Sequence, residues 1–216
     1  MPNVKLDISM SLDGYVAGPN STLELPLGKG GLGLHEWVFG LQSFREAHGG
    51  GSGEGGPDNE VVAEGLRTQG AVIMGRKMFS GGSGPWESDP NAGGWWGDEP
   101  PFRVPVFILT HHARERVVMG PATSFNFVTG GIEDALEQAR AVAGDKDVLI
   151  AGGGEVAQQY LRAGLLDEIQ IHLVPVFLGS GVRLFDGIAP DTVGLEAERV
   201  VAASPGVTHL RFRVTA

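Results

Sequence analysis

A short apolar strand that runs through three consecutive glycines into an amphipathic helix is the feature that most constrains this fold. It spans residues 147–162, with the sequence Asp-Val-Leu-Ile-Ala-Gly-Gly-Gly-Glu-Val-Ala-Gln-Gln-Tyr-Leu-Arg. Glycines leave backbone N–H groups open to an anion because no Cβ lies in the way, and the following helix directs the positive end of its dipole to the same point. We therefore expect a phosphate-binding turn at Gly152, Gly153 and Gly154.

A second apolar strand also ends at a glycine and adds positive charge. Residues 71–74 (Ala-Val-Ile-Met) are followed by Gly75, Arg76 and Lys77. We expect the turns at Gly75 and Gly152 to converge on one phosphate-bearing cofactor.

The composition indicates one globular domain. The chain has 216 residues, 42% of them hydrophobic, and no long polar linker divides it, so we expect a single domain over residues 1–216. No apolar run approaches the ~18 residues of a membrane span. The N-terminal residues alternate like a strand and lack the pattern of a signal peptide. We therefore expect a cytoplasmic protein with no membrane partner.

Charge and cysteine content exclude several classes of function. Without cysteine, the chain has no disulfide, thiolate metal site or cysteine nucleophile. A formal net charge of −10 opposes nonspecific binding to nucleic acid, which depends on Lys and Arg that replace counterions. We expect a small-molecule ligand, with local basic groups that meet any anionic part of it.

Apolar strands alternate with helical segments along most of the chain. This alternation predicts an α/β fold with a mainly parallel sheet covered on both faces, and alternating strands near the C-terminus predict an antiparallel edge. Strands are expected at residues 4–10, 15–17, 71–74, 104–110, 126–128, 147–152 and 168–174 and in a last hairpin, and helices at residues 34–47, 58–67, 132–142 and 154–162.

Some expectations concern individual elements. Residues 34–47 carry a helical apolar stripe that should lie on the sheet, and Asp58 or Asn59 is expected to cap the next helix. The strand at 168–174 should be half-buried, with Ile169, Ile171 and Leu173 inward. A hairpin turned at residues 204–206 should direct Leu210, Phe212 and Val214 inward.

Two loops stand out. Residues 49–57 are glycine-rich and expected to be flexible. Residues 81–102 are rich in glycine, proline and tryptophan, and such long loops are usually functional or mobile. The aromatic residues of this loop either stack on a substrate or fix the loop to the core; they are Trp86, Trp95, Trp96 and Phe102.

Context disfavours two familiar nucleotide motifs. Gly152, Gly154 and Ala157 fit the dinucleotide pattern, but a Rossmann fold needs more strand–helix units than the roughly 60 residues that remain can supply. Residues 70–77 match a P-loop only superficially, because Met78 occupies the position of the Ser or Thr that would hold magnesium.

A metal site is not expected. The adjacent His111 and His112 point different ways on a strand, and the other histidines are scattered along the sequence. Surface or hydrogen-bonded roles are favoured for all of them except His111; the scattered ones are His35, His48, His172 and His209.

The order of four motifs resembles that of the dihydrofolate reductase-like family. The motifs are Ser11-Leu12-Asp13-Gly14, Val72-Ile73-Met74-Gly75-Arg76, Phe107-Ile108-Leu109-Thr110 and Ile150-Ala151-Gly152-Gly153-Gly154-Glu155. The chain is most similar to the branch that contains the C-terminal reductase domain of the bifunctional deaminase-reductase of riboflavin biosynthesis. Residues 165–169 and 175–181 also match, so the resemblance covers nearly the whole chain.

The resemblance implies a three-layer α/β/α fold that binds NADPH across the strand ends. Gly75, Arg76 and Lys77 would meet the pyrophosphate and the adenosine phosphate, in agreement with the preference of phosphates for arginine. The alternative to phosphate binding is that Arg76 is only a solvated charge at a strand end and that the three glycines only form a tight strand–helix corner. The remaining implied contacts are Thr110 and His111 at the adenosine end, Gly152, Gly153, Gly154, Glu155 and Val156 at the pyrophosphate, and Ser9, Val16 and Ala17 at the nicotinamide.

Asp13 and Glu36 are the candidate catalytic residues. In hydride transfer the cofactor carries the chemistry, and the protein provides or routes one proton, usually from a carboxyl group. Asp13 lies on a glycine turn beside the presumed nicotinamide, although an Asp-Gly pair also forms turns without any other role. Glu36 is the second candidate, with a solvated helix position as its alternative. Glu155 could equally be a first-turn acid that compensates the helix dipole.

Departures from folate reductases affect the expected substrate. Those enzymes carry a threonine on a late strand and a tyrosine after the glycines, whereas this chain has His172 on the late strand and Ala157 after the glycines. We therefore expect an NADPH-dependent reductase of a pterin-, pyrimidine- or folate-like heterocycle or a carbonyl compound, with dihydrofolate itself disfavoured. The alternative is a noncatalytic NADP-binding or anion-binding protein on the same fold. The resemblance also implies a homodimer.

Overall fold

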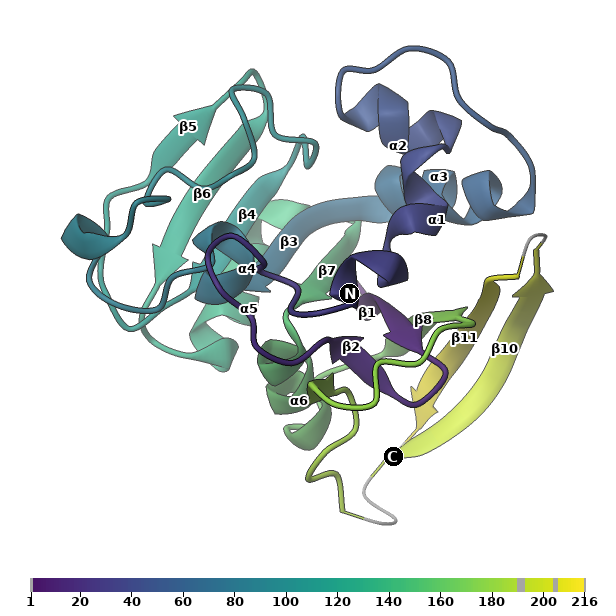
Figure 1. Cartoon of the computed structure of the whole chain (residues 1–216). Coiled ribbons are helices and arrows are strands. Elements are labelled where there is room, and N and C mark those ends of the chain that lie inside the picture. The colour runs from purple at the N-terminus through teal and green to yellow at the C-terminus, as the bar shows by residue number, and fades with distance from the viewer. Residues whose placement is uncertain (1, 190–192, 204–205, 216) are drawn as a thin grey trace.

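A sheet of nine strands runs through the molecule and positions the other elements (Figure 1). The structure is a computed structural model that describes residues 2–189, 193–203 and 206–215. The strand order is β10-β11-β8-β1-β7-β3-β4-β6-β5. All neighbours from β8 to β6 run parallel, while β10, β11 and β5 pair antiparallel. The predicted α/β class with an antiparallel C-terminal edge is confirmed, and β5 adds an antiparallel strand at the other edge.

The strands begin and end close to the expected positions. The parallel strands are β1 (Val4–Ser11), β3 (Gln69–Gly75), β4 (Pro105–Leu109), β6 (Thr123–Val128), β7 (Asp147–Gly152) and β8 (Glu168–Val174). The outer strands are β5 (Val117–Met119), β10 (Gly194–Ala202) and β11 (Thr208–Thr215). Two short strands, β2 (Tyr15–Ala17) and β9 (Val182–Arg183), form a separate pair.

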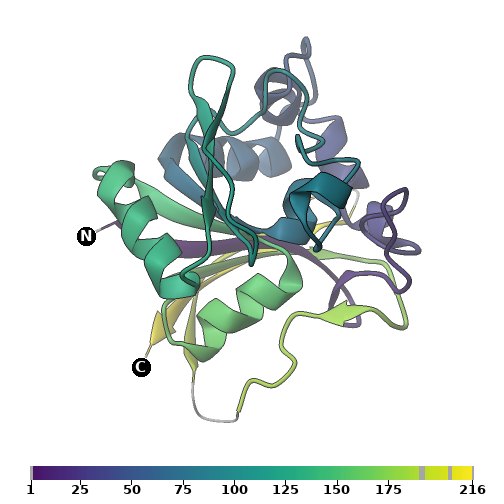
Figure 2. The same cartoon turned by 90° about the vertical axis from the view of Figure 1, so that its left-hand side faces the viewer.

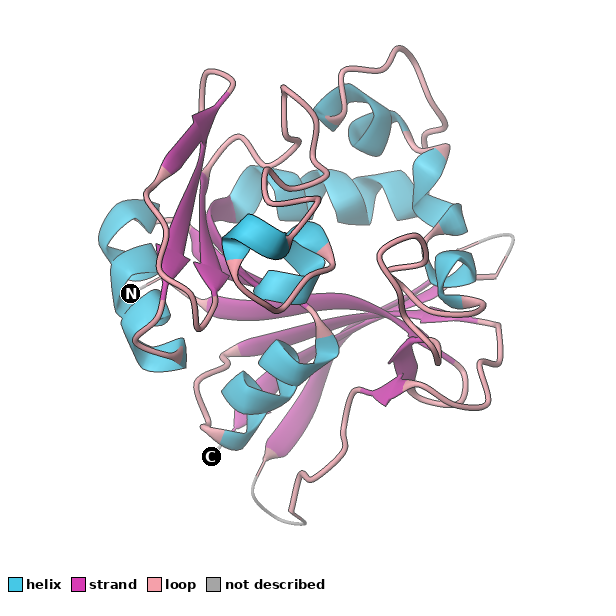
Figure 3. Ribbon diagram, turned by 60° about the vertical axis from the view of Figure 1, so that its left-hand side comes forward, coloured by secondary structure: helices cyan, strands magenta, loops and turns pink. Residues whose placement is uncertain are grey.

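Helices cover both faces of the sheet (Figures 2 and 3). One face packs against α5 (Ile132–Ala143) and α6 (Gly154–Arg162). The opposite face carries α3 (Pro57–Thr68), α4 (Arg76–Ser80) and a chain of short helices, η1 (Gly31–Leu34), α1 (Glu36–Phe39) and α2 (Gln42–Ala47). A further short turn, η2 (Trp86–Ser88), lies in the long loop.

Alternation along the strands divides the core into two halves. In β3, Ala71 and Ile73 belong to the cluster under α5 and α6, whereas Val72 and Met74 belong to the cluster that holds Phe79 of α4. In β1 the even-numbered residues enter the first cluster, while Lys5, Asp7, Ser9 and Ser11 face the side of α1 and α3. The polar face of β1 is therefore covered by helices, a condition that demands partners for its side chains.

The helix predicted over residues 34–47 is interrupted. The chain forms η1, α1 and α2 in succession, and Leu41 between the last two has an extended backbone. None of the residues of α1 or α2 is fully buried, so this segment does not lay one dry face on the sheet. The physical reason is local, because Gly40 ends α1 and glycine weakens a helix interior.

The start of α3 also differs from the prediction. Gly56 is the N-cap, and neither Asp58 nor Asn59 caps the helix; Asn59 Oδ1 instead accepts a hydrogen bond from the backbone N–H of Ser43 at 2.8 Å. The preceding glycine-rich segment, expected to be flexible, is tied at Glu54, whose backbone exchanges hydrogen bonds of 2.8 and 2.9 Å with Gly40 and Gln42.

The expectation of a half-buried β8 is wrong. Gln170 and His172 are buried as well as Ile169 and Ile171, because β8 lies between β1 and β11 with helices over both faces. In the last hairpin, Leu210, Phe212 and Val214 pack against the core as expected. The predicted turn at residues 204–206 falls largely on Ser204 and Pro205, which lie outside the described residues.

Candidate active site

The turns at Gly75 and Gly152 lie side by side. Strands β3 and β7 are neighbours, with Met74 paired to Gly152. A methyl group added to Gly75 would lie 3.8 Å from the backbone nitrogen of Gly153 and 3.9 Å from the carbonyl oxygen of Gly152. Gly152 has a φ of 114°, which favours glycine. The predicted convergence of the two turns is confirmed, and we call residues 75 and 152–154 the glycine corner.

The start of α6 completes this corner. A Cβ on Gly154 would lie 2.6 Å from Val182 and 2.8 Å from Val16, so β2 and β9 pack directly on the helix start. At Gly153, by contrast, a Cβ would meet no atom within 4 Å. Val16, expected near the nicotinamide, is therefore in contact with the glycine corner, and open space adjoins Gly153. Ala17 follows Val16 on β2.

Two other predicted cofactor residues follow the next strand. Leu109 at the end of β4 pairs with Gly75, so Thr110 and His111 continue beside the glycine corner. Thr110 is buried, and its hydroxyl accepts a hydrogen bond of 3.1 Å from the backbone N–H of His112. His111 is exposed. Most of the predicted cofactor residues therefore lie together at the carboxyl ends of three neighbouring strands, β7, β3 and β4.

Ser9 lies on the face of β1 that α1 covers. It is 6% exposed, and its hydroxyl accepts a hydrogen bond of 3.2 Å from the indole N–H of Trp37. The same N–H lies 3.0 Å from the carbonyl oxygen of Leu34.

Arg76, predicted as a phosphate ligand with a solvated charge as the alternative, is buried and already has charged and polar partners. Its side chain is 6% exposed, forms an ion pair with Asp89 and a hydrogen bond with Ser80, and lies 3.4 Å from the ring centre of Trp86. Burial raises the pKa of Asp89, but hydrogen bonds from Ser80 and Arg76 outweigh it and lower that pKa overall. The buried pair neutralises Arg76 and fixes it under the long loop, an arrangement that sequence position alone does not reveal.

Lys77 and Glu155 join the two sides of the glycine corner. The Lys77 ammonium lies 3.7 Å from the Glu155 carboxylate, and both side chains are exposed, at 63% and 73%. Such a pair is weak in water and exchanges readily for another partner. Lys77 is therefore the cation available to an anionic ligand there. Val156 follows on α6 and contacts Gly75.

Asp13 is held as an ionised turn residue. Its carboxylate accepts hydrogen bonds from the Ser11 hydroxyl at 2.6 Å and from the backbone N–H groups of Gly179 at 2.7 Å and Leu178 at 3.2 Å. The Ser11 hydrogen bond is the largest cause of a pKa lowered to about 2. A carboxyl group with this pKa carries no proton near neutrality, which argues against Asp13 as the proton donor.

Glu36, the second candidate, is exposed in the first turn of α1. Its neighbour Trp37 points inward and contacts His172 and His209, with ring centres 4.7 and 5.3 Å apart. The inward-facing residue of this helix is therefore an aromatic ring instead of the expected acid.

The aromatic residues of the long loop fix it to the core. Trp86 donates a hydrogen bond of 2.8 Å to the carbonyl oxygen of His112, and Trp96 donates one of 3.1 Å to that of Phe79. Trp86, Trp96 and Phe102 all pack on the cluster around Phe79. Trp95 is 36% exposed and lies against Gly81.

The tertiary structure brings together two histidines that appeared scattered in the sequence. His172 on β8 pairs in register with His209 on β11, and their Nδ1 atoms are 2.7 Å apart. His172 Nε2 lies 2.8 Å from Asp7, and His209 Nε2 lies 2.6 Å from Asp58. The predicted hydrogen-bonded role is confirmed for both histidines, and their contact with each other is an addition of the tertiary structure. The only sequence signal of this buried polar cluster was a polar residue at every second position of β1. The contact between the two histidines could not be predicted, because it depends on the register between β8 and β11.

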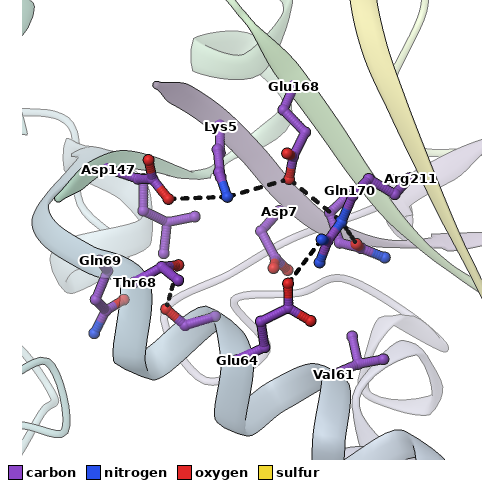
Figure 4. Close-up of a pocket in the computed structure, with 12 residues that line it drawn as sticks. Lys5, Asp7, Val61, Glu64, Thr68, Gln69, Asp147, Glu168, Gln170 and Arg211 are labelled. Carbon is purple, nitrogen blue, oxygen red and sulfur yellow. Dashed lines mark hydrogen bonds and ion pairs between the residues drawn. The ribbon is translucent and has the colours of Figure 1, made fainter. Parts of the chain in front are cut away.

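A pocket between α3 and the sheet opens beside this pair (Figure 4). Its volume is about 20 Å³, space for one or two water molecules and far below the roughly 300 Å³ of small ligand sites. Lys5 binds Asp147 at 2.9 Å, and Arg211 binds Glu64 at 2.7 Å. Asp7 also lines the pocket, near the centre of the view. The pocket lies toward the starts of the parallel strands, at the opposite end from the glycine corner.

The described residues contain neither a candidate metal site nor a candidate membrane span. No cluster of three or more histidine, aspartate or glutamate residues suits a metal ion within that part of the chain. None of the helices formed by the described residues has the length and apolar character needed to cross a bilayer.

The fold and the glycine corner define an α/β protein of the dihydrofolate reductase-like type. The RibD C-terminal domain family matches residues 2–209, and the chain belongs to that family. This confirms the family resemblance inferred from the ordered motifs.

Several known proteins are similar to this chain. The uncharacterized protein YyaP of Bacillus subtilis is 19% identical over 217 residues, which cover 96% of this chain and 92% of that protein. The uncharacterized protein YwjB of the same organism is 37% identical over only 46 residues, 21% of this chain and 26% of that protein.

Solved structures show the same fold at low identity. A protein assigned to riboflavin biosynthesis in a Shewanella species aligns with a TM-score of 0.64 at 22% identity, over 99% of both chains. A pyrimidine reductase-like protein from Corynebacterium diphtheriae aligns with a TM-score of 0.55 at 15% identity, over 100% of this chain and 92% of that one. A diaminohydroxyphosphoribosylaminopyrimidine deaminase/5-amino-6-(5-phosphoribosylamino)uracil reductase from Thermotoga maritima aligns with a TM-score of 0.56 at 16% identity, over 99% of this chain and 57% of that one.

Proposed function

We propose that this protein is an NADPH-dependent reductase of a small heterocyclic or carbonyl compound. The observation that carries the proposal is the convergence of Gly75 with Gly152 and Gly153 at one sheet edge, in a chain of the RibD C-terminal domain family. Membership of this family supports a reductase, and the glycine corner supports a cofactor with a pyrophosphate.

The residues at the corner fit such a cofactor. Open space adjoins Gly153, the N-terminus of α6 lies there, and Lys77 supplies positive charge. Backbone N–H groups at a helix start favour phosphate oxygens. Because Arg76 is already paired with Asp89, we assign the charge that meets a phosphate to Lys77. Ser9, Val16 and Ala17 remain the proposed contacts of the nicotinamide, and Thr110 and His111 those of the adenosine.

A reduced nicotinamide supplies a hydride to the carbon of a C=N or C=O bond, and the heteroatom of that bond takes up one proton. The chain orients the acceptor beside Ser9 and β2 and provides the proton. The Thermotoga relative is a 5-amino-6-(5-phosphoribosylamino)uracil reductase, so we propose an aminopyrimidine of that chemical class as the first acceptor to examine.

The proposal is tested by NADPH binding and by NADPH oxidation. Gly153→Ala adds a methyl group where no protein atom lies within 4 Å, so it should fold normally and yet weaken NADPH binding at least tenfold, about 1.4 kcal/mol. Gly33→Ala is the matched control, because its Cβ also meets no atom within 4 Å and it lies in η1. Equal NADPH affinity in the two variants, measured by fluorescence titration, would remove the glycine corner as the cofactor site.

A second experiment tests whether the protein oxidises NADPH with a candidate acceptor. Wild-type protein is mixed with NADPH and with 5-amino-6-(5-phosphoribosylamino)uracil, its dephosphorylated form or dihydrofolate, and oxidation is monitored at the nicotinamide absorbance. Tight NADPH binding without oxidation by any of them would favour the alternative, a noncatalytic NADP-binding protein. A homodimer in the cytoplasm remains a proposal, which size-exclusion chromatography with light scattering and cell fractionation would test.

A further inference from the structure

Four buried or partly buried groups form a continuous hydrogen-bonded line across four elements. Asp7 of β1 contacts His172 at 2.8 Å, His172 contacts His209 at 2.7 Å, and His209 contacts Asp58 of α3 at 2.6 Å. We call these residues the proton quartet. His209 is 1% exposed and His172 is 5% exposed, while the side chain of Asp7 is 32% exposed.

The geometry determines how many protons the quartet holds. Each of its three contacts needs one hydrogen between its two heavy atoms, since a carboxylate or a bare imidazole nitrogen can only accept. Two ionised aspartates and two neutral histidines carry only two such hydrogens. The Nδ1 atoms of His172 and His209 would then face each other as two lone pairs at 2.7 Å. The arrangement therefore requires one additional proton.

The environment places this additional proton toward Asp7. Burial lowers the pKa of His209, which keeps that ring neutral with its Nε2–H directed to Asp58. The Nδ1 of His209 then accepts from His172, and the remaining proton lies between His172 Nε2 and Asp7 Oδ1. Because Asp7 is the most exposed member of the quartet, it is the end at which a proton can leave or enter.

The other charged groups that face the quartet are largely paired among themselves. Lys5 on β1 binds Asp147 and Glu168, and Arg211 on β11 binds Glu64 of α3 and Glu168 of β8. His35 precedes α1, and burial together with the charge of His172 lowers its pKa. No ion pair other than those with the two histidines involves Asp7 or Asp58 among the described residues, so the quartet is a distinct unit.

The quartet lies beside the proposed nicotinamide contact. Asp7 and Ser9 point to the same face of β1, about 7 Å apart by the strand repeat. Trp37 connects them, because its N–H donates to Ser9 while its ring lies 4.7 Å from that of His172. Gly65 of α3 lies close to the other carboxylate oxygen, since a Cβ there would be in van der Waals contact with Asp7 Oδ2 at 3.7 Å.

From this we infer that Asp7 is the catalytic acid of the reductase and that His172, His209 and Asp58 supply it with a proton. The inference rests on the proposed function. As hydride reaches the acceptor carbon, the π pair of the C=N or C=O bond moves to the heteroatom, which takes the proton from Asp7. The quartet falls from three bridging hydrogens to two, and water returns the missing proton through the exposed Asp7. His172, His209 and Asp58 are positioning residues in this scheme.

The proton count is tested without cofactor or substrate. Nitrogen-15 NMR of histidine-labelled wild-type protein, assigned with His172→Gln and His209→Gln, reports the protonation of each ring nitrogen. We expect both Nε2 atoms to be protonated or sharing a proton and a single proton between the two Nδ1 atoms at neutral pH. Two unprotonated Nδ1 atoms, or two histidines that titrate independently, would overturn the inference.

The delivery of the proton is tested with the acceptor that wild-type protein reduces. Asp7→Asn keeps the shape of the side chain but removes the acid, so kcat should fall about 100-fold or more while the NADPH Kd is unchanged. In wild-type protein kcat should decrease as rising pH removes the additional proton, and this dependence should be absent in Asp7→Asn. His209→Gln should shift the pH profile without changing NADPH binding.

Matched controls are Asp134→Asn, an exposed carboxylate bonded to Gln138, and His48→Gln, an exposed ring stacked on Phe44. If Asp7→Asn retains the kcat and pH profile of the Asp134 control, the catalytic role of Asp7 is refuted while the reductase stands. If wild-type protein binds no NADPH, the proposed function fails, and the NMR experiment still decides the proton count.

Discussion

The carboxylate of Asp13 accepts a hydrogen bond of 2.7 Å from the backbone N–H of Gly179, a residue 166 positions later in the chain. This contact joins the turn after β1 to the loop after β8. A second bond of 3.2 Å comes from the N–H of Leu178, and the Ser11 hydroxyl donates a third of 2.6 Å. Asp13 is thus a tie between two loops, and its ionised form is the one that the structure stabilises.

Asp13→Asn should therefore destabilise the protein in a pH-dependent way. Its pKa is lowered from 3.8 to about 2 in the folded state, so the stabilisation is fully present above pH 4 and is lost as pH falls toward 2. The Tm of the variant should lie below that of wild type at pH 7, and the two should converge near pH 2. Thermal unfolding across this range is the measurement, with Asp134→Asn as control. A difference that is constant with pH would contradict this account.

Arg76→Ala should cost about 3 to 5 kcal/mol of unfolding free energy. The substitution leaves the side chain of Asp89, 2% exposed, without its charge partner, and removes the contact with Trp86. Urea unfolding gives the value. Arg213→Ala, which breaks an ion pair of two side chains that are each 58% exposed, should cost less than about 1 kcal/mol. If Arg76→Ala matched that control and lost the preference for NADPH over NADH, the original phosphate assignment would be restored.

Tyr160→Phe should destabilise the contact between α5 and α6 by about 1 to 2 kcal/mol. The fully buried Tyr160 donates a hydrogen bond of 2.7 Å to the carbonyl oxygen of Ile132, and burial strongly raises its pKa. Removing the hydroxyl leaves that oxygen without this donor. Tyr15→Phe is the matched control, because its hydroxyl lies 3.4 Å from the Gly179 oxygen and should contribute less. The unfolding free energies of both variants, measured by chemical denaturation, test this prediction.

Gly154→Ala should disturb the start of α6 and cost about 1 to 3 kcal/mol. The added methyl group would lie 2.6 Å from Val182 and 2.8 Å from Val16, two β-branched side chains that have little rotamer freedom. Gly33→Ala, which meets no atom within 4 Å, should remain within about 0.5 kcal/mol of wild type. A neutral Gly154→Ala would show that β2 and β9 move easily away from the helix.

Local pattern was sufficient to predict the elements that shape the proposed cofactor site. The apolar strands at 71–74 and 147–152 each end at glycine, and parallel strands bring their carboxyl ends to one edge, so the convergence of Gly75 and Gly152 followed from the sequence. The apolar stripe at residues 34–47 wrongly predicted one continuous helix. Hydrophobic periodicity alone takes no account of Gly40, which ends α1, or of the extended backbone of Leu41.

The sequence by itself determined the α/β class, the glycine corner and the family, because these depend on hydrophobic period and on glycine positions that are local in the chain. Only the tertiary structure decided which charges are free and which are paired. Arg76 finds Asp89 across the long loop, and His172 finds His209 through the register of β8 and β11. Partners far apart in sequence are chosen by packing and strand register, which no short segment encodes.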